Sequence, residues 1–108
     1  MSRALHVNEN TFKGEVLNAM QPVVVDFWAG SASADQTMAS VLEEIRREMG
    51  ERLKIVRVNV DDNPSLADQY HIESVPRLIY FLNGLVHDQT TGPATKQEII
   101  SKIRALPR

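Results

Sequence analysis

Pro22-Val23-Val24-Val25-Asp26-Phe27-Trp28-Ala29 is an apolar run that a single carboxylate interrupts, and small residues follow it from Gly30 to Ala34. Successive β-branched and aromatic residues predict an interior strand that is covered on both faces. We expect the acid within this strand to be buried, and buried carboxylates are concentrated at functional sites. A helical pattern begins at Gln36, so the loop joins a strand's carboxyl end to a helix's amino end, where α/β proteins place reactive groups.

Outward from this stretch, strands and helices alternate along the chain. Asn83-Gly84 is a hairpin turn signal, and Thr95 with Glu98 forms a capping box that opens a last helix. Apolar spacing predicts strands at 5–7, 23–29, 53–60, 78–82 and 85–86, and helices at 10–20, 36–49, 64–70 and 96–106. Strands that alternate with helices pair in parallel, and the hairpin adds an antiparallel end. We also expect the methionines on apolar helix faces to lie in the core, namely Met20, Met38 and Met49.

Length and charge restrict the class of protein. The chain has 108 residues, which predicts one domain over 1–108, and its formal net charge is −2 with scattered Lys and Arg. We therefore expect no nucleic-acid partner and no membrane partner. No apolar stretch is long enough for a span and no signal-peptide core is present, so a cytoplasmic protein is expected.

The cysteine count is zero, which excludes disulfides, thiolate metal sites and thiol catalysis. The three histidines, His6, His71 and His87, lie far apart without ligand-type spacing. The chain has no glycine-rich phosphate loop and no nucleophile elbow. We therefore expect no metal and no cofactor.

Four segments resemble the thioredoxin family in order and in mutual spacing: 24–29, 58–64, 70–76 and 81–84. The resemblance covers almost the whole chain and implies the thioredoxin fold. That fold is an α/β architecture with a central mixed sheet of about five strands, flanked by four helices on both faces.

The resemblance also implies roles for single positions. Asp26 matches the buried aspartate beneath the family's active site, and Trp28 matches the tryptophan packed beside it. Arg57 falls where the family has a lysine near that aspartate. Pro76 matches the cis-proline that faces the redox pair, and Gly92 matches the glycine on the substrate-binding rim.

The family's redox motif, Trp-Cys-Gly-Pro-Cys, aligns with Ser31-Ala32-Ser33-Ala34-Asp35. Disulfide exchange needs a thiolate that attacks sulfur, so reductase activity does not transfer to this chain. An engineered knockout of an ordinary family member would replace only the two cysteines, whereas five consecutive positions differ from the family's motif here. A natural, degenerate relative is therefore the better interpretation.

Two interpretations remain for Asp26, Asp35 and Arg57. They could form an acid–base pair tuned by a cation. Alternatively, Asp35 favours the helix amino end while Asp26 pairs with Arg57 or is inherited from a redox ancestor. We prefer the second, because no nucleophile, metal or phosphate cradle accompanies them. If nothing compensates its burial, Asp26→Ala should stabilise the fold; a loss of stability would mean that the pair with Arg57 matters.

The backbone beside the proline survives the loss of the thiols. In the family this segment pairs with an extended substrate, so Ser74, Val75 and Pro76, with Gly92 opposite, predict a partner-binding groove, and Arg77 adds a long cation near it. We expect a redox-inactive module that binds a protein partner or an extended peptide segment, in a chaperone-like or assembly role. The alternatives are an oxidoreductase family member whose cysteines are lost or replaced, and a structural subunit of a complex. The sequence leaves the oligomeric state open.

Overall fold

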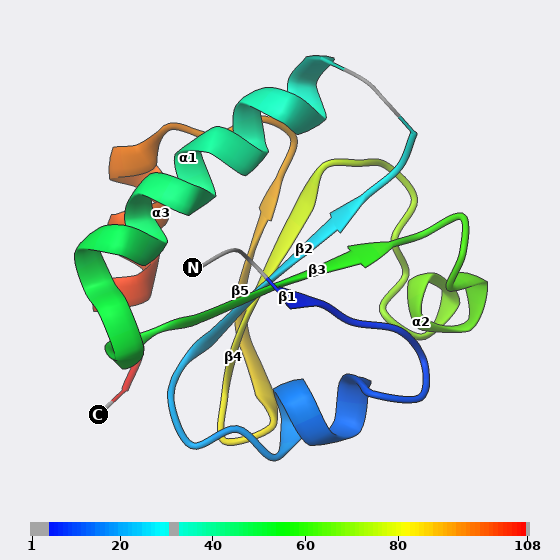
Figure 1. The fold of residues 1–108 in the computed structure, drawn as a ribbon, viewed down its shortest axis with the longest axis horizontal. Coiled ribbons are helices and arrows are strands. Elements are labelled where there is room, and N and C mark those ends of the chain that lie inside the picture. The colour runs from blue at the N-terminus through cyan, green and yellow to red at the C-terminus, as the bar shows by residue number, and fades with distance from the viewer. Residues whose placement is uncertain (1–4, 31–32, 108) are drawn as a thin grey trace.

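The computed structural model describes residues 5–30 and 33–107, and for residues 33–36 it describes the backbone only. Within this part of the chain, five strands form one mixed sheet in the order β1-β3-β2-β4-β5 (Figure 1). The strands are β1 (Leu5–His6), β2 (Val23–Trp28), β3 (Lys54–Asn59), β4 (Arg77–Leu82) and β5 (Leu85–Thr91). The fold class expected from the sequence is confirmed.

The central strand of the sheet is β2, the apolar run with the acid. It pairs in parallel with β3 and in antiparallel with β4, and residues 23–27 of β2 are all buried. Parallel strands need a crossover connection, which α1 (Ser33–Met49) and the short turn η2 (Gly50–Arg52) provide between β2 and β3. Gly50 has φ +58°, a left-handed conformation that lets it end α1 as expected.

Helices cover both faces of the sheet. On one face, α1 and α3 (Lys96–Arg104) pack with alternate strand residues into a core that contains Val24, Met38, Leu42, Ile45, Ile55, Leu78, Tyr80, Ile99 and Ile103. On the other face, η1 (Lys13–Leu17) and α2 (Pro64–Gln69) help enclose Phe12, Val16, Val25, Phe27, Val58, Leu66, Ile79 and Phe81. Because side chains alternate along a strand, the odd-numbered residues of β2 point toward η1 and α2, and its even-numbered residues point toward α1 and α3.

The first helix differs from the prediction. The pattern predicts a helix over 10–20, but the structure has only the π-helical turn η1, which ends before Asn18. Met20 therefore lies in the connection to β2 and is 90% exposed, so its placement in the core was wrong. The helical spacing of apolar residues predicts which side chains are buried only for residues within the helix, and Met20 lies beyond its end. Met38 is buried in the core as expected, and Met49 packs against it.

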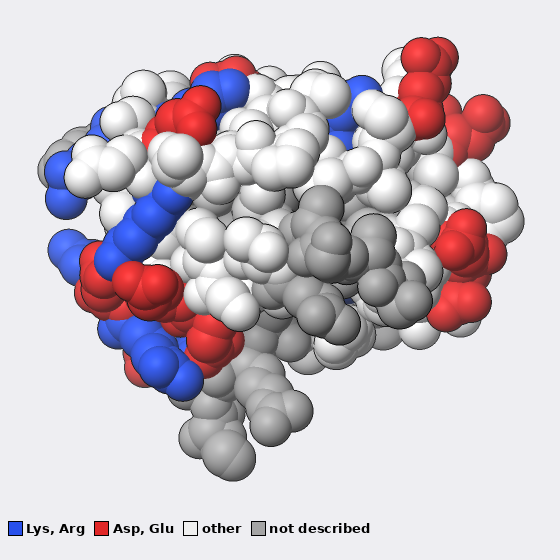
Figure 2. Space-filling view, turned by 90° about the horizontal axis from the view of Figure 1, so that it is seen from above, with Lys and Arg blue, Asp and Glu red and all other residues white. Residues whose placement is uncertain are grey.

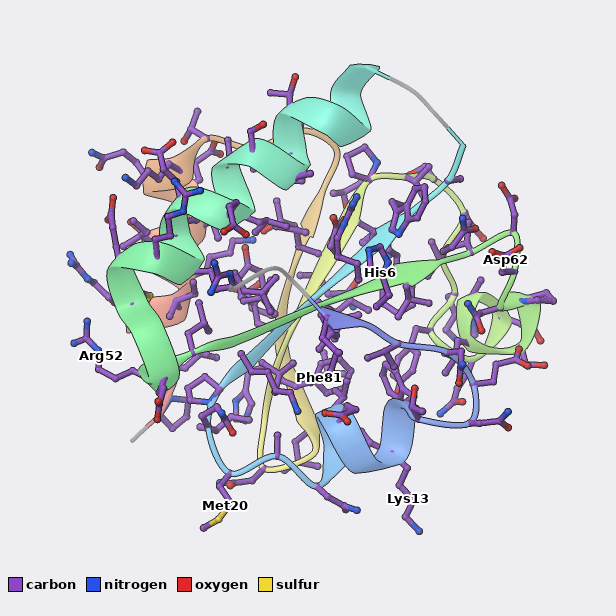
Figure 3. All side chains as sticks on the ribbon, in the orientation of Figure 1. His6, Lys13, Met20, Arg52, Asp62 and Phe81 are labelled. Atoms are coloured by element: carbon purple, nitrogen blue, oxygen red, sulfur yellow. The ribbon has the colours of Figure 1, made fainter. Side chains whose placement is uncertain are left out.

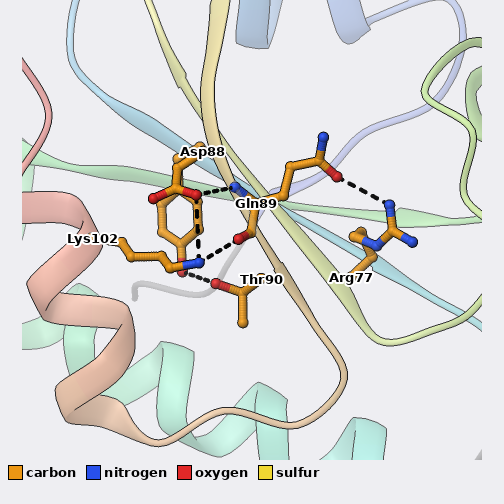
Figure 4. A network of polar contacts seen from close by, with 6 residues as sticks. Arg77, Asp88, Gln89, Thr90 and Lys102 are labelled. Carbon is orange, nitrogen blue, oxygen red and sulfur yellow. Dashed lines mark hydrogen bonds and ion pairs between the residues drawn. The ribbon is translucent and has the colours of Figure 1, made fainter.

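Strand β5 extends beyond the predicted 85–86 and forms one edge of the sheet. Lys102 of α3 donates to the backbone oxygen of Gln89 and lies 3.5 Å from the Asp88 carboxylate (Figure 4). Charged groups along an edge strand oppose pairing with further strands. Beneath them, the buried Tyr80 hydroxyl bonds the Thr90 hydroxyl at 2.8 Å.

The start of the last helix follows the prediction, since Thr95 and Glu98 form both hydrogen bonds of a capping box. No helix in the described ranges is long and apolar enough to cross a membrane.

Candidate functional site

Asp26 lies at the middle of the central strand and is fully buried. The register places Arg57 of β3 directly opposite, and the Arg57 Nε donates to Asp26 Oδ2 at 2.9 Å. The Arg57 side chain is 13% exposed, so the cation reaches from the surface to a carboxylate that has no access to solvent. A buried charge persists when a partner and hydrogen bonds offset its desolvation, which is the contact seen here.

The Arg57 guanidinium also lies over an aromatic ring. Its Cζ is 4.8 Å from the ring centroid of Trp28, an arrangement that cation–π attraction favours. The His6 ring contacts the same indole edge-on, with centroids 6.4 Å apart. The Trp28 Nε1 is buried and has no hydrogen-bond partner within the described residues. Arg57 thus links Asp26, at the middle of β2, to Trp28, at the end of β2.

The predicted groove segments around Pro76 and Gly92 lie in two loops that meet at this end of the sheet. The Val75–Pro76 peptide bond is cis, as the resemblance implies, and Pro76 is buried. The Gly92 N–H donates to the Pro76 oxygen at 2.9 Å. Because Phe27 pairs with Arg77, Pro76 lies next to the position of Trp28 in the ladder. The fold therefore brings the predicted groove segments together.

Ser74 and Val75 are exposed beside Pro76, and the Val75 side chain retains 38% of its surface. Val75 forms no backbone hydrogen bond with any other described residue. Arg77 opens β4, and its Nη1 donates to Gln89 Oε1 at 3.0 Å. Figure 2 looks onto the end of the molecule where α1 begins; the described residues near its middle are mostly neither Lys or Arg nor Asp or Glu, and charged side chains gather toward the left and right ends. An exposed backbone segment with an apolar side chain can pair with an extended chain.

The structure describes the five positions that align with the redox motif only in part. Ser31 and Ala32 lie outside the described residues. Ser33, Ala34 and Asp35 form the first residues of α1, but their side chains are not described. The proposed contact between Asp26 and Asp35 therefore stays a prediction.

Two neighbours of the site were not expected from the sequence. His6 reaches Trp28 because β1 pairs in parallel with β3, with His6 opposite Arg57. Gln89 reaches Arg77 because β5 continues past Val86. The sequence did contain one indication of where His6 lies. Side chains alternate along a strand, so His6 must point to the opposite face from the buried Val7. Nothing local indicated Gln89.

The group offers a carboxylate, a guanidinium and an indole. Within the described residues, no group of three or more histidines and acids is placed to hold a metal ion. The sequence contains no thiol. The arrangement can hold the Asp26 and Arg57 charges in fixed positions and can present the backbone beside Pro76 to a partner. It supplies no group for disulfide exchange.

Comparison with known proteins agrees with this architecture. The family model described as Thioredoxin matches residues 3–105. Thioredoxin 1 of Synechococcus elongatus is 40% identical over 103 residues, covering 95% of this chain and 96% of its own. Thioredoxin 1 of Nostoc sp. is 42% identical over 96 residues (89% and 90%), and the thioredoxin of Griffithsia pacifica is 37% identical over 98 (91% and 90%). The chain belongs to the thioredoxin family.

Proposed function

We propose that this chain is a redox-inactive thioredoxin-like protein that binds a protein partner or an extended peptide segment through the former substrate groove. The groove consists of Trp28, Ser74, Val75, Pro76, Arg77 and Gly92. The observation that carries the proposal is the combination of an exposed Val75 beside Pro76, whose backbone forms no hydrogen bond with any other described residue, with the absence of cysteine from the sequence. Binding by strand addition needs only backbone groups and side-chain contacts, so it does not depend on thiol chemistry.

A chaperone-like or assembly role follows from this kind of binding. Contact through the backbone is tolerant of the partner's sequence, while pockets for alternate side chains add preference. The Asp26–Arg57 pair then has a structural task, because it holds Trp28 and the end of β2 in place beneath the groove. A cytoplasmic location and a single domain over residues 1–108 stay predictions from the sequence.

Affinity capture from a lysate tests the groove. The wild-type chain is compared with Val75→Asp and with Leu5→Asp, a control in which the same substitution is made on β1 at a similar exposed fraction, 42% against 38%. We expect one dominant partner that wild type and Leu5→Asp both capture and that Val75→Asp loses by about tenfold or more, which corresponds to about 1.4 kcal/mol. Equal thermal midpoints establish that all three chains are folded.

The other outcomes identify a different role. A partner that all three chains retain would move the interface away from the groove and favour a structural subunit. Capture of nothing by any chain would argue against a binding module.

The second candidate function is a thiol-disulfide oxidoreductase whose active-site cysteines are lost or replaced in this form. The names of the relatives favour it, since proteins 33–42% identical to this chain are called thioredoxins. An insulin reduction assay compares the wild-type chain with a chain that carries cysteines at positions 32 and 35. Activity in the second chain alone would show that the scaffold still supports the reaction, and no activity in either chain would argue against this second candidate.

A further inference from the structure

A hollow lies at the end of the sheet opposite the groove. It has a volume of about 770 Å³, and the connection before β2, the end of α1, the β4–β5 hairpin and α3 line it. We call it the hairpin hollow, and its main apolar residues are Met20, Met49, Leu82, Leu85, Ile103 and Leu106. Strand β4 runs from Arg77 at the groove to Leu82 at the hollow, a distance of about 17 Å at the usual rise of a strand. The two surfaces are therefore separate.

Exposed apolar side chains gather at the hairpin hollow. Among the described residues, Met20 is 90% exposed and Leu85 is 65% exposed, and both line it. Val86, which follows Leu85, is 44% exposed. Single exposed apolar residues are ordinary, but a group of them around a concave surface is typical of an interaction site. An exposed methionine adapts easily to the shape of a partner, because its side chain is flexible and polarisable.

The charges at the rim are unbalanced. Arg52 and Arg104 both line the hollow, and neither has a carboxylate within 4.0 Å among the described residues. Arg52 only donates to the Met49 backbone oxygen, at 3.2 Å. The acid at the rim, Glu48, is already bound by Lys96 of α3. Met20 and Arg52 both project outward in Figure 3, Met20 at the bottom of the view and Arg52 at its left, so each is accessible.

We propose that the hairpin hollow binds an acidic amphipathic helix of a partner protein. The helix would place large apolar side chains against Met20 and Leu85, and its carboxylates would face Arg52 and Arg104. The lining consists of side chains from α1, α3 and the β4–β5 hairpin, and a concave surface with apolar side chains can receive the apolar face of a helix. The proposal does not rest on the function of the groove.

A second copy of the chain is a poorer occupant. Two hollows related by a two-fold axis would bring Arg52 and Arg104 of one copy toward the same arginines of the other. Like charges that face each other across an interface oppose association. The partner that the charges favour is one with acidic residues beside its apolar stripe.

Two synthetic helices of about 18 residues (five turns) test the charge preference. Both carry leucines at i, i+3, i+4 and i+7; one has glutamates flanking this stripe, and the other has lysines in their place. Binding is followed by the NMR signals of ¹³C-labelled methionine methyl groups in the full chain. Met20 and Met49 line the hollow, whereas Met38 is 2% exposed in the core and is the internal control.

We expect the glutamate helix to shift the methyl signals of Met20 and Met49 saturably and to leave that of Met38 unchanged. The lysine helix should bind about tenfold more weakly. Leu85→Asp should weaken binding of the glutamate helix by about tenfold, whereas Leu5→Asp, the same substitution at a 42% exposed position on β1, should not. Arg52→Ala and Arg104→Ala should each weaken it up to about fivefold, the usual limit for an exposed ion pair.

Three results would overturn the proposal. One is equal affinity for the glutamate and lysine helices. Another is a set of shifts that leaves Met20 and Met49 unchanged. The third is a change in the methyl signals with protein concentration in the absence of any helix, which would assign the hollow to self-association. Failure here leaves the groove test unaffected, because that test depends on Val75.

Discussion

Replacing Arg57 by methionine removes the cation that contacts the buried Asp26 and keeps much of the side-chain volume. The Asp26 carboxylate has no exposed surface, and the Arg57 Nε is 2.9 Å from it. At an effective dielectric constant of 20, unit charges 4 Å apart attract by about 4 kcal/mol. An acid left buried without its cation keeps its desolvation cost, so Arg57→Met should lower the free energy of unfolding by about 3–5 kcal/mol.

Two further variants separate the pair from its parts. Asp26→Leu combined with Arg57→Met removes both charges, and the result should range from neutral to about 4 kcal/mol more stable than wild type. Asp26→Ala leaves a guanidinium that is 13% exposed and still lies over Trp28, so it should destabilise less than Arg57→Met. Because the contact with Arg57 offsets the burial of Asp26, we expect Asp26→Ala to lower the midpoint of unfolding.

Urea unfolding at neutral pH, followed by circular dichroism, measures these differences, because urea does not screen the ion pair as an ionic denaturant would. Unchanged stability in Arg57→Met would refute the reasoning, since it would mean that Arg57 does not offset the burial of Asp26. A double variant that is as unstable as Arg57→Met alone would refute it too.

Three further changes test the packing around the sheet. Tyr80→Phe leaves the buried Thr90 hydroxyl without its 2.8 Å partner and should cost about 1–3 kcal/mol, whereas Tyr80→Phe with Thr90→Val should be nearly neutral in the same urea experiment. Burial raises the pKa of Tyr80. The stability that the neutral phenol contributes is therefore present below about pH 10 and is lost as the pH rises through the folded-state pKa. Between neutral and alkaline pH, the thermal midpoint of Tyr80→Phe should fall less than that of wild type. Gly50→Ala should cost about 1–2 kcal/mol, because alanine is disfavoured in the left-handed conformation of that residue. Gly84→Ala should destabilise the protein by more than this. Both glycines have positive φ, but only at Gly84 would a Cβ approach a backbone oxygen of η1, at 2.9 Å, and equal midpoints would contradict this steric argument. Thr95→Ala should lose about 1 kcal/mol through its cap, with recovery in Thr95→Ser; no loss would mean that the capping box does not stabilise α3.

Local patterns were sufficient for most of the architecture. The apolar run of β2, the turn at Asn83-Gly84 and the capping box at Thr95 each depend on a few neighbouring residues, and each lies where the sequence places it. The pattern also placed Asp26 in a buried strand, because an acid between apolar residues such as Val25 and Phe27 has no exposed position in a covered sheet. Helix ends were less certain, as η1 shows.

By itself, the sequence determined the thioredoxin fold and the absence of cysteine from the chain. Both follow from residue types and their spacing along the chain. Only the tertiary structure decided that Arg57 contacts Asp26 and Trp28 together, that His6 joins them, and that Met20 lies exposed beside Leu85. These contacts depend on the register between strands far apart in sequence and on the residue at which a helix ends. Both are set by the balance of long-range packing, which no local pattern contains.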